Sequence, residues 1–167
     1  MRRTTPRLEL ISITTEHVDD LVRLHADADV AAWHGGTWTH ARATEFAESN
    51  MERLGRDGAA KWIAYARASG DLVGRGGLSL TAIDGKEYWE DGWTLQRRYW
   101  GHGYATQIGR EGIVVAFDEL GAREVVAFTE PHNARSRAVM ERLGMDLVGE
   151  IDHAGEHFVL YRTDGRP

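Results

Sequence analysis

Two glycines, Gly101 and Gly103, stand between a strand-like segment, residues 88–95, and a helix-like segment that ends at Leu120-Gly121. Glycine lets the backbone approach a ligand closely, because it has no side chain. The unpaired N–H groups of a first helical turn point to one spot, where the helix dipole favours an anion. The pattern therefore indicates a pyrophosphate site. A plain connecting loop is the alternative, since the chain has 19 glycines and the same spacing recurs at Gly74-Arg75-Gly76.

The glycine turn matches neither of two common nucleotide-binding motifs. Thr106 occupies the position of the third glycine in a dinucleotide fingerprint, and no Gly-Lys-Ser/Thr follows as in a P-loop. A second feature, Asn133-Ala134-Arg135-Ser136, follows one strand and a turn after the glycine helix. Two helix N-termini and two strand C-termini would then meet at one edge of a sheet, where ligands bind in open α/β folds.

The composition narrows the class of protein. A length of 167 residues suits one domain with a full core, so we expect residues 1–167 to form a single domain. The absence of cysteine excludes disulfides, Cys-zinc sites and thiol nucleophiles. A formal net charge of −6 weighs against nucleic acid as the main partner. No apolar run is long enough for a membrane span or a signal core, so we expect a cytoplasmic protein without a membrane partner.

The elements that would position these residues alternate between strands and helices. Hydrophobic patterns and turn residues predict strands at residues 7–13, 61–66, 72–80, 87–95, 123–129, 145–151 and 156–162. Helices are predicted after Thr14-Thr15, from Thr39 to Gly55, from about Tyr104, and after Asn133. Residues 29–38 are predicted to be irregular. The order β-α-α-β-β-β-α-β-α-β-β predicts an α/β fold with a mixed sheet of about seven strands flanked by about four helices.

The two chemical features resemble the motifs of one enzyme family, the GNAT acetyltransferases. Residues 90–95, followed by residues 99–106, resemble its motif A, and Asn133-x-x-Ser136, followed by residues 139–145, resembles its motif B. The most similar branch is the RimJ/RimL type, which acetylates ribosomal-protein N-termini. The resemblance spans essentially the whole chain. It implies the GNAT fold and transfer of an acetyl group from acetyl-CoA to a primary amine, either a protein N-terminus, which is favoured, or a small amine.

The resemblance also assigns cofactor contacts residue by residue. The glycine turn would bind the acetyl-CoA pyrophosphate, and the end of the preceding strand would bind the pantetheine arm. A backbone N–H group there would polarise the thioester carbonyl. Asn133 would contact the cofactor arm or the acceptor. The implied cofactor-binding residues are Trp93, Thr94, Leu95, Arg98, Gly101, His102, Gly103, Tyr104, Ala105, Thr106 and Asn133.

Two residues are candidates for catalytic proton transfer. Glu90 matches an acidic position that is common in the family, and it could take the proton of the amine through a water molecule. A solvated structural carboxylate is the alternative. Many family members protonate the leaving thiolate with a tyrosine where this chain has Met140. Ser136 is then the candidate acid, with a role in helix capping as the alternative.

The sequence carries the least specific motif for the residues that would contact the acceptor amine. Trp33 and Trp38 lie beside two glycines in a loop that overhangs the acceptor in similar GNATs, and they could line a substrate pocket; core packing is the alternative for each. No metal site is predicted, because His153 and His157 flank a glycine-containing turn instead of sharing a helix face.

Two further possibilities stay open for the whole chain. A catalytically silent acyl-CoA-binding or sensor domain would keep the glycine turn while Glu90 and Ser136 proved dispensable. Acetylation of aminoacyl-tRNA is disfavoured by the acidic charge. A monomer and a homodimer are both compatible with the sequence.

Overall fold

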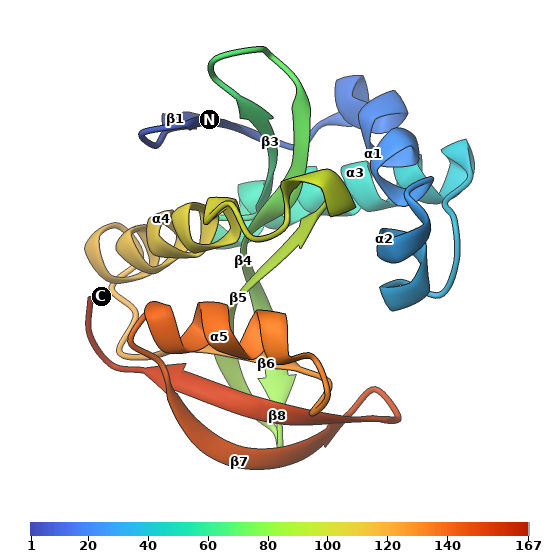
Figure 1. The fold of residues 1–167 in the computed structure, drawn as a ribbon. Coiled ribbons are helices and arrows are strands. Elements are labelled where there is room, and N and C mark those ends of the chain that lie inside the picture. Colours follow the sequence, from blue (N-terminus) through green and yellow to red (C-terminus); the bar gives the residue numbers. More distant parts are fainter. Residues whose placement is uncertain (167) are drawn as a thin grey trace.

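The protein is described by a computed structural model that covers residues 1–166, and it contains a single sheet of eight strands (Figure 1). The strand order is β1-β2-β3-β4-β5-β6-β8-β7, and all neighbours are antiparallel except the parallel pair β5 and β6. The strands are β1 (Arg2–Thr4), β2 (Leu8–Ser12), β3 (Lys61–Ala66), β4 (Leu72–Ile83), β5 (Lys86–Leu95), β6 (Val125–Thr129), β7 (Asp146–His153) and β8 (Glu156–Thr163).

Five α-helices cover the sheet, with α1, α2 and α3 on one flank and α4 and α5 on the other (Figure 1). They are α1 (Val18–His25), α2 (Ala28–Trp33), α3 (His40–Asp57), α4 (Tyr104–Asp118) and α5 (Ala134–Arg142), with 3-10 turns at Thr15–His17 and Arg97–Tyr99. The predicted α/β fold with a mixed sheet is confirmed. The predicted order lacked two short elements, β1 and α2. Within the described residues, no helix is long and apolar enough to cross a membrane.

The prediction that residues 29–38 are irregular is wrong for their first half, which forms α2. The helix begins because the Asp27 side chain accepts a hydrogen bond from Asp29 N at 3.0 Å, which caps the first turn. It ends before Gly35 and Gly36, whose φ angles of 68° and 103° lie in the region that glycine adopts most readily.

The end of α3 also differs from the prediction, which placed it at Gly55. Thr39 caps the start as expected, by accepting a hydrogen bond from Arg42 N at 3.2 Å. Gly55 stays helical, and the helix ends at Gly58, which has φ 84° and donates its N–H to Leu54 O at 3.1 Å. Two glycines near one helix end look alike in sequence, but only Gly58 adopts the left-handed conformation of a helix C-terminus.

Alternation along the strands sends side chains into two separate cores. In β3, Trp62 packs with residues of α4 and α5, whereas Ile63 packs with residues of α1 and α3. Both side chains are almost fully buried, and burial of an aliphatic side chain such as that of Ile63 contributes about 1.5–3 kcal/mol. The two cores fix the sheet between the helix layers.

The parallel strands β5 and β6 pair over only a short stretch. Their partners are Trp89 with Val125 and Glu90 with Val126, and no pairing continues toward Leu95. Beyond this point β5 ends beside α4 and β6 ends beside α5. The separation of the two strand ends opens the centre of the molecule.

Candidate active site

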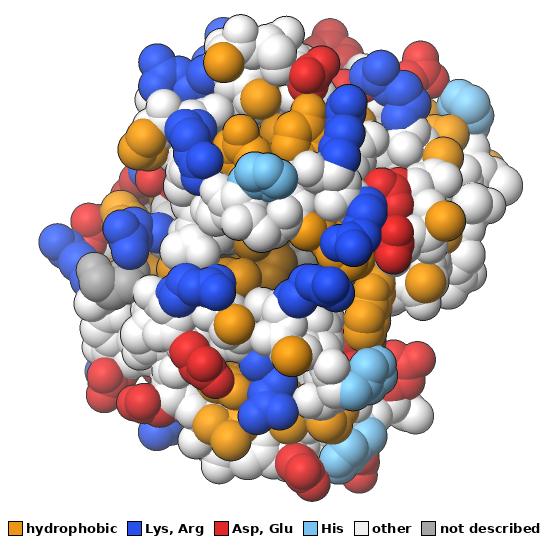
Figure 2. All heavy atoms as spheres, in the orientation of Figure 1, with side chains coloured by type: hydrophobic (Ala, Val, Ile, Leu, Met, Phe, Trp, Pro, Cys, Tyr) orange, Lys and Arg blue, Asp and Glu red, His pale blue; other side chains and the backbone are white. Residues whose placement is uncertain are grey.

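A cavity of about 920 Å³ lies where β5 and β6 separate, with walls from α2, α4 and α5. Figure 2 shows a hollow with hydrophobic side chains at its floor and Lys and Arg side chains on either side, where Figure 1 has α4 facing α5. Arg135 and Arg142 of α5 are among the lining residues. An apolar floor with cationic walls suits a ligand that has an extended neutral arm and an anionic end.

Most residues that the sequence singled out line this cavity. Three do not: Arg98, His102 and Trp38. The predicted residues that line it are Trp33, Glu90, Trp93, Thr94, Leu95, Gly101, Gly103, Tyr104, Ala105, Thr106, Asn133 and Ser136. Segments that are far apart in the chain therefore meet here, as the two motifs predicted.

The glycine turn presents unpaired backbone donors to the cavity. Gly101 and Gly103 adopt φ angles of 78° and 76°, and Gly103 is the N-cap of α4. Among the described residues, none of the N–H groups from Gly101 to Thr106 donates a hydrogen bond, and the first such bond in the helix is Gln107 N to Gly103 O. The turn therefore combines free donors with the positive end of the helix dipole, which is an anion site.

The N-terminal segment holds the glycine turn in place, a feature that the sequence did not indicate. Arg7 donates a hydrogen bond to His102 O, and its guanidinium lies 4.5 Å from the centre of the Tyr104 ring. Gln107 accepts hydrogen bonds from Arg7 N at 3.2 Å and from Thr5 Oγ1 at 2.6 Å. The first turn of α4 is thereby fixed from the side opposite the cavity.

Arg98 and His102 lie on the outside of this turn. The Arg98 guanidinium packs 4.8 Å from the centre of the Tyr99 ring and donates to Gln96 Oε1 at 3.2 Å. His102 is exposed, and its carbonyl group holds the contact to Arg7. Neither residue lines the cavity; the resemblance assigned backbone amide groups of this turn, and not these two side chains, to the pyrophosphate.

The backbone of β5 presents hydrogen-bonding groups to the gap at every second residue. Gln96 N, just after the strand, donates to a β4 carbonyl group at 3.0 Å. Because paired and unpaired positions alternate in an antiparallel ladder, the backbone of Thr94 also faces β4. The N–H groups of Trp93 and Leu95 then point into the gap. Leu95 O, on the same side, accepts a hydrogen bond from Trp100 Nε1 at 2.7 Å.

The carboxylate of Glu90 is fixed by two neighbouring strands. Its Oε2 accepts hydrogen bonds from Lys61 Nζ of β3 at 2.7 Å and from Ser79 Oγ of β4 at 2.9 Å. Oε1 lies over Gly92, where a β-carbon would come within 2.5 Å of it. Glycine at position 92 therefore leaves the space that this carboxylate occupies.

The start of α5 is capped as predicted. Asn133 Oδ1 accepts a hydrogen bond from Ser136 N at 3.1 Å, and Asn133 Nδ2 donates to Thr129 Oγ1 at 3.0 Å. The Ser136 hydroxyl group has no hydrogen-bond partner among the described residues and lies on the cavity wall. Met140, one turn further along, is buried on the same wall.

The two tryptophans of residues 29–38, both predicted to line a substrate pocket, occupy different environments. Trp33 lines the cavity and stacks on His132, with ring centres 5.3 Å apart. Trp38, predicted to line the substrate pocket, is instead buried in the core, where it stacks on His25 at 3.6 Å. The reason is that the chain turns inward after Gly36, toward the face that α1 and α3 cover.

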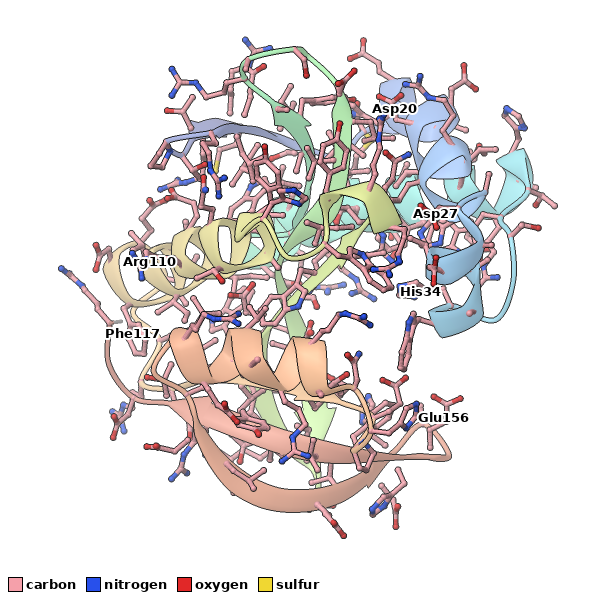
Figure 3. All side chains as sticks on the ribbon, in the orientation of Figure 1. Asp20, Asp27, His34, Arg110, Phe117 and Glu156 are labelled. Atoms are coloured by element: carbon pink, nitrogen blue, oxygen red, sulfur yellow. The ribbon has the colours of Figure 1, made fainter. Side chains whose placement is uncertain are left out.

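Two histidines lie at or next to the part of the cavity that α2 and β5 line, and both are neutral near pH 7. His34 follows α2 on the side that faces β5 (Figure 3), and its Nε2 lies 3.0 Å from Thr94 Oγ1. Burial, and then the positive charge of Arg75, lower the pKa of His34 to about 4. The same two causes lower the pKa of His25 to about 2. Neither ring titrates in the range where an amine substrate is deprotonated.

Several lining residues were not predicted from the sequence. His34, Lys61 and Arg75 come from a loop and two strands that carry no motif. The one available signal was Arg75 itself, a charged residue inside an otherwise apolar, glycine-rich strand. In the part of the chain that the structure describes, no cluster of three or more His, Asp or Glu side chains could hold a metal ion.

Comparisons with known proteins agree with this geometry. The family model for the acetyltransferase (GNAT) domain matches residues 7–146. The FsC-acetyl coenzyme A-N(2)-transacetylase of Aspergillus fumigatus is 31% identical over 153 residues, which are 86% of this chain but only 64% of the fungal protein.

Solved structures share the whole fold. An acetyltransferase from Agrobacterium tumefaciens superposes with a TM-score of 0.83 at 21% identity, covering 99% of this chain and 95% of that one. The RimL ribosomal L7/L12 alpha-N-protein acetyltransferase, in complex with coenzyme A, gives a TM-score of 0.79 at 19% identity, covering 97% and 96%.

Proposed function

The chain belongs to the GNAT family of acetyltransferases, and from this premise we propose that it transfers the acetyl group of acetyl-CoA to a primary amine bound between β5 and β6. One observation carries the proposal. The unpaired N–H groups of residues 101–106 open into a cavity that is large enough for an extended cofactor arm and its acceptor. The two left-handed glycines and the start of α4 bring these donors together at one wall of the cavity, where an anionic group can replace the water that they would otherwise bind.

The residues of the cavity fit acetyl-CoA. The N–H groups of the glycine turn and the guanidinium groups of Arg135 and Arg142 would hold the pyrophosphate. The N–H and C=O groups of Trp93 and Leu95 would pair with the amide groups of the pantetheine arm, as a further strand would. When bound, acetyl-CoA supplies an activated acetyl group as a thioester. A backbone N–H of β5 that faces the gap would polarise its carbonyl group.

The acceptor amine reacts only in its neutral form, because an ammonium group has no lone pair. A peptide N-terminus has a pKa of roughly 8 and a lysine side chain of roughly 10.4, so the second needs a base more than the first. Glu90 would take this proton through a water molecule; both of its hydrogen bonds go to Oε2, which supports Oε1 as the atom that acts.

The leaving thiolate of coenzyme A needs a hydrogen-bond donor. The resemblance aligns Met140 with a tyrosine that many family members carry, and the Met140 side chain, which is buried here, cannot donate. The Ser136 hydroxyl group lies on the same wall and is free to donate, since it forms no other hydrogen bond among the described residues. Ser136 is therefore the acid that we assign.

Two acceptor classes fit the cavity, and a protein N-terminus is favoured. The fold is shared with an enzyme named for the α-amino group of ribosomal protein L7/L12, which supports a protein N-terminus. The fungal relative is named an FsC-acetyl coenzyme A-N(2)-transacetylase, which supports transfer to a nitrogen atom, and a small amine is the second candidate acceptor. In both cases the amine would enter from the side that α2 covers, past Trp33.

The test is release of free thiol from acetyl-CoA in the presence of a panel of amines, with mass spectrometry of the products. The panel contains peptides with free N-termini, free amino acids and polyamines. We expect at least one class to give an N-acetylated product at a rate that depends on the enzyme. Tight binding of acetyl-CoA without acetylation of any amine would favour the silent acyl-CoA-binding domain instead.

A further inference from the structure

Arg75 is a buried cation at the acceptor end of the cavity. It lies on β4, is only 8% exposed, and yet is one of the lining residues. Its Nε donates a hydrogen bond to His25 Nε2 at 3.3 Å. Its guanidinium packs 4.7 Å from the ring centre of Phe46 and 5.4 Å from that of Trp38. These contacts engage Nε and the face of the guanidinium, so the two terminal nitrogens stay available to a ligand in the cavity that Arg75 lines.

No side chain among the described residues neutralises this charge. His25 is held in its neutral form, because burial and the charge of Arg75 keep its pKa at about 2. The charge of Glu90 acts on Arg75, but the Glu90 carboxylate is bound to Lys61. Neither terminal nitrogen of Arg75 has a hydrogen-bond partner within residues 1–166. A buried charge without a counter-ion is costly, so buried cations are normally paired.

We propose that Arg75 binds a carboxylate group carried by the acceptor, so that the acceptor is an amine with a carboxylate close to the reacting nitrogen. This inference rests on the proposed acetyl transfer and names the substrate class for it. The planar guanidinium matches a carboxylate with two parallel hydrogen bonds, which is a geometry that a single ammonium group does not offer.

The sheet places this carboxylate site near the site of reaction. Arg75 lies directly opposite Thr94 on β5, and neighbouring strands are about 4.8 Å apart. Thr94 lies between Trp93 and Leu95, whose backbones face the gap. The carboxylate and the amine must therefore be separated by a short distance, as in a free amino acid or in a peptide with an acidic residue at its start.

The charges on this face complement such an acceptor. Alternation along the strands puts Arg75, Glu90 and Thr94 on the same side of the sheet. The carboxylate of Glu90 would attract the ammonium group at encounter, while Arg75 would attract the carboxylate group. The ammonium groups of a simple polyamine would be attracted by Glu90 but repelled by Arg75. The site would therefore select against polyamines as acceptors.

The test measures binding without turnover. Isothermal calorimetry with coenzyme A present compares N-acetyl amino acids, which are reaction products, with their carboxamides. We expect the carboxylate form to bind at least tenfold more tightly in at least one pair. Arg75→Met should remove this difference, and Arg75→Lys should retain part of it. The matched control is Arg42→Met, because Arg42 packs 5.0 Å from the same Trp38 ring but does not line the cavity.

A second set of probes identifies the source of the carboxylate. Acetylated peptides with glutamate at the second position are compared with the same peptides carrying glutamine. A preference confined to single amino acids assigns a free amino acid as acceptor, and a preference in the peptides assigns an acidic protein N-terminus. Equal affinity within every pair, or no binding of any carboxylate probe, overturns the inference even without a folded Arg75 variant. Failure of acetyl transfer itself is seen separately, as absence of thiol release from every amine.

Discussion

Lys61 Nζ lies 2.7 Å from Glu90 Oε2, and only 13% and 16% of the two side chains are exposed. Lys61 also donates to Gly77 O at 2.6 Å, so its ammonium group is held by two strands. The ion pair orients the carboxylate, and it places a positive charge beside the group that we assign as the base. The remaining oxygen, Oε1, is therefore the atom through which Glu90 can act on the amine.

The pH profile of the reaction tests this role. We predict that kcat/KM rises with pH as the acceptor amine loses its proton, and that Glu90→Gln moves this rise to higher pH because the amine must then deprotonate in solution. Steady-state rates over pH with one confirmed amine measure the shift. Glu87→Gln is the control, since Glu87 is an exposed acid on the same strand. An unmoved profile in Glu90→Gln would remove Glu90 from proton transfer.

The two tryptophans are predicted to respond in opposite ways. Trp38→Ala should lower the free energy of unfolding by about 3–5 kcal/mol, because it removes a buried ring that stacks on His25. Trp33→Ala should leave stability nearly unchanged and raise the acceptor KM, with the Kd for acetyl-CoA preserved. Denaturant unfolding and steady-state kinetics measure the two effects. An unchanged acceptor KM in Trp33→Ala would assign that ring to the contact with His132 alone.

The position of Asp91 predicts an unusual dependence of stability on pH. Its side chain is buried against α4, where Gly112 leaves room for it, and neither carboxylate oxygen has a hydrogen-bond partner of good geometry among the described residues. Burial raises the pKa of Asp91 well above its usual range. The folded protein therefore keeps this proton at pH values where the unfolded chain, with a pKa of roughly 3.9, has lost it.

In that pH window the unfolded state binds fewer protons, so the free energy of unfolding falls as pH rises. The fall is at most about 1.4 kcal/mol per pH unit from this one group, and it ends above the folded-state pKa. We predict that Asp91→Asn removes this part of the slope and gains stability relative to wild type as pH rises above 4. Asp84→Asn, in an exposed turn, should keep the wild-type slope. Identical slopes in Asp91→Asn and wild type would contradict the assignment.

Local signals explain why the order of the larger elements, and the glycine turn and α5 cap that line the cavity, could be predicted. A glycine turn before a helix, an Asn cap at α5 and an Asp-Gly hairpin each depend on a few adjacent residues. The resemblance to a family then joined them into one site. The missed helix α2 has only six residues, too few for a helical hydrophobic pattern.

The acceptor end could not be predicted in the same way, because its contacts join distant residues. Arg75 meets His25 across 50 positions of the chain, and Lys61 meets Glu90 across 29. Trp33 and Trp38 stand beside the same glycines, yet one lines the cavity and the other fills the core. The path of the backbone after Gly36 decides which tryptophan is buried, and the sequence around the two residues does not show this path.

The glycine turn is the feature on which the whole assignment depends, and titration of acetyl-CoA into Gly103→Val tests it most directly. Gly103 has φ 76°, which a β-branched residue resists, and a β-carbon there would lie 3.3 Å from the Arg7 guanidinium that holds the turn, so the substitution should displace the N–H donors. Gly85→Val is the matched control, since Gly85 has φ 78° in a hairpin outside the cavity. We predict that Gly103→Val raises the Kd at least tenfold, about 1.4 kcal/mol, while Gly85→Val does not. An unchanged Kd in folded Gly103→Val would contradict binding at this turn.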